Sequence, residues 1–236
     1  QFSDLDAVGS AVGMWSAATK GVKKPAYIVI DRNATMAMPI VDEIEAVHDS
    51  EEKIFISEEE ALDMLTPRSL VIVVDTHSPD FVESKELLNE AQRVVVIDHH
   101  RMMVKHIDNA VVFYHEPYAS SASEMVSELV QYIGNTVLSK EEADALLAGI
   151  MLDTKNFVLK SGVRTFEAAA YLRRRGADTV VVKKMFASNI DTYKEKYSLI
   201  STAEVYNGCA IACTDESTPN VRVAAAQAAD ELLSIQ

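Results

Sequence analysis

The chain has 236 residues, of which 48% are hydrophobic and 25% are charged, with a formal net charge of −14 at pH 7. This composition excludes a disordered protein and allows one large domain plus part of another. The negative charge opposes binding to long nucleic acids, which depends on counterion release. Bilayer-length apolar runs and a signal-peptide pattern are absent, so we expect a soluble region.

Three apolar runs in the first hundred residues each end at an aspartate. They cover residues 26–30, 70–74 and 94–97, and they predict buried parallel strands. Helical patterns lie between them, one opened by a capping box of Ser57 and Glu60 and another over residues 81–93. The alternation predicts an α/β fold, a parallel sheet with helices on both faces.

The second half of the chain is mostly helical. Capping boxes begin two helices, Ser121 with Glu124 and Ser139 with Glu142, and the first is expected to place Met125, Leu129 and Ile133 on one face. A third helix is expected over 165–175, ended by Gly176.

The last forty-odd residues predict a separate, smaller unit. A helical connector over 192–204 precedes a strand-like segment over 205–213 and a helix over 221–235. One βα unit cannot bury its own apolar face, so we interpret it as the start of a second α/β domain. The predicted organisation is a first domain over 1–190, a helical linker over 191–203 and the incomplete second domain over 204–236.

Acidic side chains and histidines gather where the predicted strands end. Asp75 and the triplet Asp98, His99 and His100 follow apolar runs, at the sheet edge where α/β proteins bind ligands. Asp4 and Asp6 open a segment of small residues, which we expect to form a helix packed closely on the sheet. Asp153 follows another apolar run. Oxygen ligands with some imidazole favour Mn²⁺ or Mg²⁺ over structural zinc.

Each of these residues also has an ordinary structural interpretation. Asp31 is expected to be only a turn residue. Asp4 and Asp6 taken alone are compatible with a helix cap, and His99 alone with a buried core histidine. His77 is equally compatible with a role supporting the metal ligands and with a surface position. The coincidence of so many groups nevertheless favours a metal site.

The motifs resemble those of a known family. Residues 3–7, 74–77, 97–100 and 152–154 are similar, in order and spacing, to the four metal motifs of DHH phosphoesterases. The resemblance covers residues 1 to about 190. Residues 116–121 and 153–157 further resemble the cyclic di-AMP phosphodiesterases of the membrane-anchored GdpP type.

The resemblance implies a manganese-dependent enzyme that hydrolyses cyclic di-AMP to the linear dinucleotide pApA in second-messenger signalling. It implies two Mn²⁺ ions, with Mg²⁺ or Co²⁺ as alternatives. Asp4 and Asp75 would hold the first ion, and Asp75 would bridge to the second. The second ion would be held by Asp6, His99 and Asp153, and Asp98 would orient His99. The implied catalytic residues are Asp75, Asp98, His99 and His100. The implied substrate contacts are His100, Ser120 and Ser121.

Two departures from the family pattern leave alternatives open. The family's first histidine ligand would fall immediately before Gln1, and its glycine-rich substrate-binding segment has no match here. We therefore expect a cytoplasmic part of a longer, membrane-anchored protein, with a homodimer as a family expectation. The alternatives are a short linear oligonucleotide phosphodiesterase, of the nanoRNase or RecJ-like kind, and a non-catalytic nucleotide-binding fragment.

Overall fold

The chain divides into two compact units. The computed structural model describes residues 3–48, 53–186, 190–214 and 221–233. The first unit is Gln1–Met185 and the second is Phe186–Gln236. The identity of the second unit as part of a substrate-binding domain stays a prediction.

Parallel strands form the centre of the first unit, as predicted. A three-stranded sheet has the order β3-β4-β5, and a separate pair is formed by β1 and β2. In the larger sheet Val71 lies beside Val94, and Val95 beside Val112. The three predicted runs are all strands, although the first is shorter than expected. The strands are β1 (Ile28–Val29), β2 (Phe55–Ile56), β3 (Val71–Val74), β4 (Val94–Asp98) and β5 (Val112–His115).

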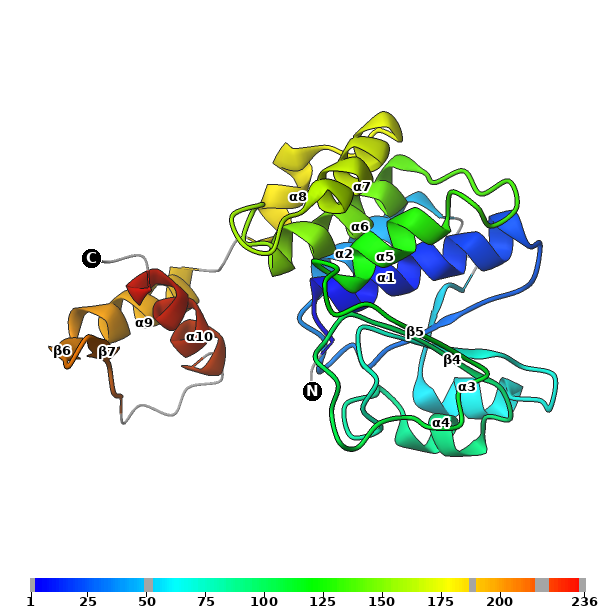
Figure 1. Ribbon diagram of the computed structural model, residues 1–236, viewed down its shortest axis with the longest axis horizontal. Coiled ribbons are helices and arrows are strands. Elements are labelled where there is room, and N and C mark those ends of the chain that lie inside the picture. The colour runs from blue at the N-terminus through cyan, green and yellow to red at the C-terminus, as the bar shows by residue number, and fades with distance from the viewer. Residues whose placement is uncertain (1–2, 49–52, 187–189, 215–220, 234–236) are drawn as a thin grey trace. The chain divides into compact units, whose positions relative to one another are not determined.

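Helices cover both faces of this parallel arrangement, which confirms the predicted fold class. On one side Leu88 packs against Val94 and Val96, while Ala61 packs with Ile56. On the other side lie α1 and α5, and Figure 1 shows α3 and α4 across the strands from them. The helices of this unit are α1 (Leu5–Ser16), α2 (Met38–Val47), α3 (Glu58–Met64), α4 (Lys85–Glu90), α5 (Ala122–Leu129), α6 (Lys140–Asp153), α7 (Val163–Arg174) and α8 (Thr179–Met185), with a π-helical turn at Ala17–Gly21.

Capping side chains set the beginnings of several helices. The boxes at Ser57 and Ser139 are formed in full, as predicted. Ser121 accepts a hydrogen bond from the Glu124 amide, but the Glu124 carboxylate bonds to Ser120 and so leaves the box half made. The expected helix face through Ile133 is wrong, because α5 ends at Leu129. The helix expected over 81–93 is likewise confined to α4.

Glycines allow α1 and α6 to lie in direct contact. A Cβ on Gly9 would lie 2.4 Å from the Ala145 carbonyl oxygen, and one on Gly149 would lie 2.5 Å from Oδ1 of Asp6. Non-bonded contacts of a Cβ atom are essentially never this short, so neither position admits a side chain without movement. The small residues after Asp6 therefore pack against α6, where we had expected the sheet. This contact brings the first turn of α1 close to the last turns of α6.

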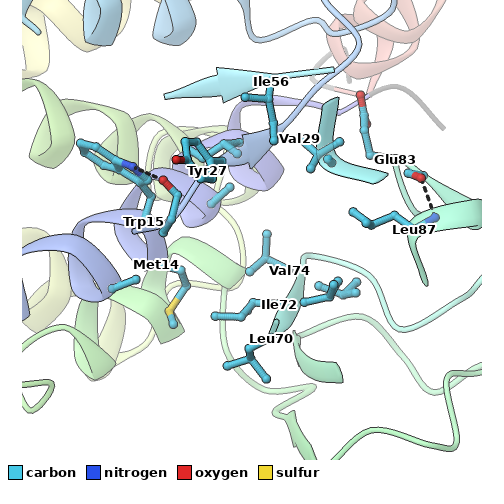
Figure 2. A pocket seen from close by; sticks show the side chains of 18 of the residues that line it. Met14, Trp15, Tyr27, Val29, Ile56, Leu70, Ile72, Val74, Glu83 and Leu87 are labelled. Atoms are coloured by element: carbon cyan, nitrogen blue, oxygen red, sulfur yellow. Dashed lines mark hydrogen bonds between the residues drawn. The ribbon is translucent and has the colours of Figure 1, made fainter. Parts of the chain in front are cut away.

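A large apolar cavity separates the strand pair β1 and β2 from β3. It has a volume of about 940 Å³ and is lined by side chains that include Val29, Ile72 and Val74 (Figure 2). Trp15 closes part of it and donates a hydrogen bond from Nε1 to the Ala26 carbonyl, 3.1 Å away. The β3 side chains are consequently only half-buried, although their sequence is that of a core strand.

The second unit differs from its prediction. The segment over 205–213 is an antiparallel hairpin rather than one strand, since Tyr206 pairs with Cys209 around a turn at Asn207 and Gly208. Both turn residues have positive φ, as this tight hairpin turn requires. No helix in the described part of the chain is long and apolar enough to cross a membrane. The elements are α9 (Ile190–Ser201), β6 (Glu204–Tyr206), β7 (Cys209–Ile211) and α10 (Val221–Leu232), with Leu199, Ala224 and Ala228 between the two helices.

Candidate metal centre

The first two aspartates are fixed by helix N-termini. Asp4 caps α1, because its Oδ1 accepts hydrogen bonds from the amides of Asp6 and Ala7. Asp6 is fully buried, and its two carboxylate oxygens accept from the amides of Ala122 and Ser123 at the start of α5. The positive end of a helix dipole favours a carboxylate at this place. Asp6 is thus held by a helix that begins 116 residues later in the chain.

The remaining acidic groups come from the ends of β3, β4 and α6. Asp75 follows β3 with a φ of +60°, a left-handed conformation that aspartate adopts more readily than most residues. Such backbone strain is concentrated at functional sites. Asp98 ends β4, which places His99 and His100 just beyond the sheet. Asp153 is the last residue of α6, close to α1 because of the glycine contact.

The structure brings three of the predicted metal ligands around a fourth, His99. Its Nε2 lies 3.1 Å from Oδ2 of Asp153, 3.3 Å from Oδ1 of Asp75 and 3.8 Å from Oδ2 of Asp6. Two groups of donor atoms lie within metal-binding reach of one another. One contains Asp6, His99 and Asp153, and the other contains Asp75, His99 and His100.

Two buried atoms at the centre of this cluster have no hydrogen-bond partner in the described structure. They are Oδ1 of Asp75 and Nε2 of His99. Buried polar atoms left without partners are costly, and a cation bound between them would satisfy both. The donor set of carboxylate oxygens with imidazole nitrogen therefore fits a divalent metal ion, as the sequence predicted.

Carboxylates are crowded together in this cluster, and the pKa values of its groups are shifted as a result. Burial and the nearby Asp153 raise the pKa of Asp6 to about 6, and burial together with Asp6 raises the pKa of Asp75 well above its ordinary value. Burial also raises the pKa of Asp4. Burial opposes charge on His99, yet the carboxylates of Asp153 and Asp75 beside its Nε2 raise its pKa to about 10. A proton is held here because like charges crowd together.

Asp98 has a different role from its neighbours. Its Oδ1 accepts hydrogen bonds from the amides of His99 and His100 and lies 2.8 Å from Nδ1 of His100. Its other oxygen is hydrogen bonded to Nδ1 of His77. Burial alone would raise the pKa of Asp98, but the bonds from His100 and His77 hold it below its ordinary value. The ring oriented by Asp98 is therefore that of His100, where the sequence had suggested His99.

His77 is a supporting residue, one of the two interpretations that its sequence left open. It is buried, and its Nε2 accepts a hydrogen bond of 2.8 Å from the Met103 amide. The Asp98 carboxylate is thereby connected, through the imidazole, to the loop that follows the histidine triplet. His77, His115 and Asp98 form a third group of potential metal ligands. In this group Asp98 is already hydrogen bonded to His77, and Nε2 of His115 is hydrogen bonded to the His100 carbonyl oxygen.

Other predicted residues lie away from the two donor groups around His99. Asp4 belongs to neither, and its Oδ1 is used as a helix cap. Ser120 and Ser121 are buried, with their hydroxyls bonded to Glu124 and to its amide, so their contact with substrate stays a prediction. Asp31 makes turn hydrogen bonds to its own loop, in agreement with its expected role.

A cavity of about 950 Å³ opens in front of the two histidines. Sequence reasoning had not assigned a role to Arg101, Tyr118 or Lys160, which lie around it. The position of Arg101 directly after the triplet was an available signal. That of Lys160 was not, because it depends on an unusual backbone turn.

The fold and the site together define a class of protein: an α/β domain whose sheet carries, at its carboxyl edge, a cluster of carboxylates and histidines that could hold a metal ion. Residues 1–150 match the model of the DHH family, N-terminal domain, and the chain belongs to this family.

Relatives with named activities are similar along the whole chain. It is 42% identical over 239 residues to the cyclic-di-AMP phosphodiesterase GdpP of Geobacillus thermodenitrificans, and 40% identical over 240 residues to the cyclic-di-AMP phosphodiesterase PdeA of Listeria monocytogenes. Each alignment covers 100% of this chain and 36% of the relative. The chain thus spans about a third of the length of these relatives.

A solved structure supports the fold. An exopolyphosphatase-related protein from Bacteroides fragilis superposes with a TM-score of 0.68 at 20% sequence identity, over 86% of this chain and 59% of that one.

Proposed function

We propose that this chain is the catalytic region of a metal-dependent phosphodiesterase that hydrolyses cyclic di-AMP to pApA in second-messenger signalling. The observation that carries the proposal is the pair of unpartnered atoms, Oδ1 of Asp75 and Nε2 of His99, within a ring of carboxylates. The similarity to two named cyclic-di-AMP phosphodiesterases supports the choice of substrate.

Two Mn²⁺ ions are the proposed cofactors. Asp6, His99 and Asp153 would hold one ion and Asp75 would lie between the two, with Asp4 available to the other after a rearrangement of its cap. Bound divalent ions supply activation of water and neutralisation of phosphate charge. Mg²⁺ and Co²⁺ are the alternatives, because both accept oxygen and imidazole ligands.

The protein's own groups orient the substrate. His100 is half-exposed, lines the cavity and is held through Nδ1 by Asp98. Its Nε2 is consequently available to donate a hydrogen bond to a phosphate oxygen in the transition state. His77 fixes the Asp98 carboxylate from behind, so the two histidines act on opposite sides of one aspartate. Hydrolysis then proceeds by water without a covalent intermediate.

The proposal is tested by metal-dependent hydrolysis of cyclic di-AMP beside pApA and a short single-stranded oligonucleotide. We expect cyclic di-AMP to be cleaved at the highest kcat/KM, with pApA as the product, and we expect chelation to abolish the activity. A preference for the linear substrates would favour the oligonucleotide phosphodiesterase. Bound metal without hydrolysis of any of them would favour a non-catalytic binding role. A membrane tether and a homodimer stay predictions.

A further inference from the structure

The cavity in front of His100 is larger than the metal chemistry needs. Its volume of about 950 Å³ is at the upper end of the range for pockets that enclose whole small ligands. A single phosphodiester group beside the metal ligands would leave most of this space empty. The side chains at the cavity's outer part therefore bear on what else the substrate carries.

Two basic side chains line this outer part, Arg101 and Lys160. Both are exposed, and among the residues that the structure describes neither forms an ion pair. Several other basic residues do, for example Arg164 with Glu128 and Lys105 with Asp80. Because the chain has 36 acidic and 22 basic residues, two unpaired cations beside a carboxylate-rich centre favour an anionic ligand.

Lys160 reaches the cavity by way of a left-handed turn. Lys155, Asn156 and Phe157 have φ values of +48°, +57° and +67°, and Lys160 has +53°. Left-handed backbone is unfavourable for residues other than glycine. If α6 simply continued, Lys160 would lie about 10 Å beyond Asp153 along the helix axis. The turn instead places it at the cavity that His100 lines.

Thr154 holds this turn in place. Its Oγ1 donates to the Ile150 carbonyl at 2.6 Å and accepts from the Phe157 amide at 2.9 Å. Its carbonyl oxygen accepts from the amides of Val158 and Leu159, each at 2.8 Å. Strained backbone that is held by several hydrogen bonds is concentrated at functional sites. The strained turn after Asp153 therefore indicates that the position of Lys160 has a functional role.

An aromatic side chain lies at the same cavity. Tyr118 lines it and is 95% exposed, so its ring makes almost no contact with the protein. Stacking of a nucleobase on an exposed aromatic ring is favourable and tolerates any base, because every base has a flat π face. Two exposed basic side chains and an exposed aromatic ring thus occur together around one opening.

We propose that Lys160 and Arg101 bind the phosphate of a cyclic dinucleotide that is not being cleaved, while Tyr118 stacks on one of its bases. The inference rests on the proposed function and adds to it the residues that select a two-phosphate substrate. A charge-assisted hydrogen bond from Lys160 strengthens binding by roughly tenfold or more.

The test compares Lys160→Ala with Lys155→Ala. Both substitutions remove one lysine with a similar positive φ from the segment after α6, but Lys155 does not line the cavity. Each variant is assayed in Mn²⁺ on cyclic di-AMP and on bis(p-nitrophenyl) phosphate, which has a single phosphodiester and no nucleobase. We expect Lys160→Ala to lower the ratio of kcat/KM on cyclic di-AMP to kcat/KM on the model diester about tenfold, mainly through KM. Lys155→Ala should keep the wild-type ratio.

The outcomes separate this inference from the proposed function. If Lys160→Ala keeps the wild-type ratio, or Lys155→Ala lowers it equally, the phosphate site is wrong while cyclic di-AMP hydrolysis stands. If the wild-type protein cleaves the model diester but not cyclic di-AMP, the proposed function fails, and the inference fails with it. A tenfold loss in Lys160→Ala that Lys155→Ala does not share, accompanied by a similar loss in Tyr118→Ala, supports both.

Discussion

The buried metal centre and the open rim of its cavity are built in different ways. Asp6, Asp98 and His99 are almost fully buried and are fixed by helix N-termini, strand ends and hydrogen bonds. Tyr118, Arg101 and Lys160 are exposed and are placed by loops. The difference teaches that regular elements fix the buried cluster, whereas loops, which tolerate sequence change more readily, carry the side chains that we propose to contact the substrate.

Removal of a central carboxylate is expected to have the largest effect. Asp75→Asn keeps the volume of the side chain but replaces the carboxylate, whose Oδ1 faces His99, by a neutral amide. We expect Mn²⁺ binding, measured by calorimetry, to be lost together with turnover. Asp31→Asn is the matched control, because Asp31 lies in a turn outside the cluster. If the Asp75→Asn variant bound as much metal as the wild type, Asp75 would not be a metal ligand.

The next effect concerns Asp98, which supports the centre without being a proposed ligand. Loss of such partners commonly reduces metal affinity or activity by about 10–100-fold. Because three of its four contacts involve the His99 and His100 segment, Asp98→Ala should reduce kcat at least this far. Circular dichroism checks that the fold persists. A folded variant with normal kcat in saturating manganese would contradict the orienting role.

Acidity should weaken the centre through its bound protons. In the metal-free protein Asp6 has a pKa of about 6 and His99 a pKa of about 10. Between these two values a metal ion must displace the proton of His99, and below pH 6 it must also displace a proton from Asp6. As the pH is lowered from 8 to 6, we expect Mn²⁺ affinity to fall about tenfold per pH unit. Below pH 6 we expect it to fall more steeply. Calorimetric titration between pH 5 and 8 measures the slope, and an affinity independent of pH would contradict it.

A smaller effect is expected at the glycine contact that connects the ligands of α1 and α6. Gly149→Ala would place a methyl group 2.2 Å from Oγ of Ser123 and 2.9 Å from the Asp6 Cα, so atoms must move. Overpacking of this kind costs about 1–3 kcal/mol of unfolding free energy, measurable in urea. Gly162→Ala, which meets open space, is the control. Equal stability of the two variants would argue against the tight contact.

At the rim, the effect of replacing Tyr118 should depend on whether the aromatic ring is kept. Tyr118→Phe keeps the ring that is proposed to stack on a base, and we expect kcat/KM on cyclic di-AMP to stay within about twofold of wild type, because the hydroxyl takes no part in stacking. Tyr118→Leu should lower it by more. Steady-state kinetics on both variants decides this, and equal losses in the two would show that stacking is not the contact.

The sequence predicted the buried centre better than its rim for physical reasons. Asp75 and Asp98 follow strand-like runs, so parallel pairing alone brings them to one edge. The partnership of His100 with Asp98 depends on ring orientation, which spacing does not encode. Lys160 depends on a left-handed turn of residues that usually avoid it. The cavity between β1 and β3 was also absent from the sequence analysis, because both strands have the composition of a closed core.

The measurement that bears most directly on the central claim is hydrolysis of cyclic di-AMP by the purified protein, stripped of metal and then titrated with Mn²⁺, with products separated by chromatography. The account predicts no turnover without metal, and turnover that rises with bound Mn²⁺ and yields pApA. Hydrolysis that persists at full rate in chelator, or protein that binds Mn²⁺ at the His99 cluster and leaves cyclic di-AMP intact, would contradict it.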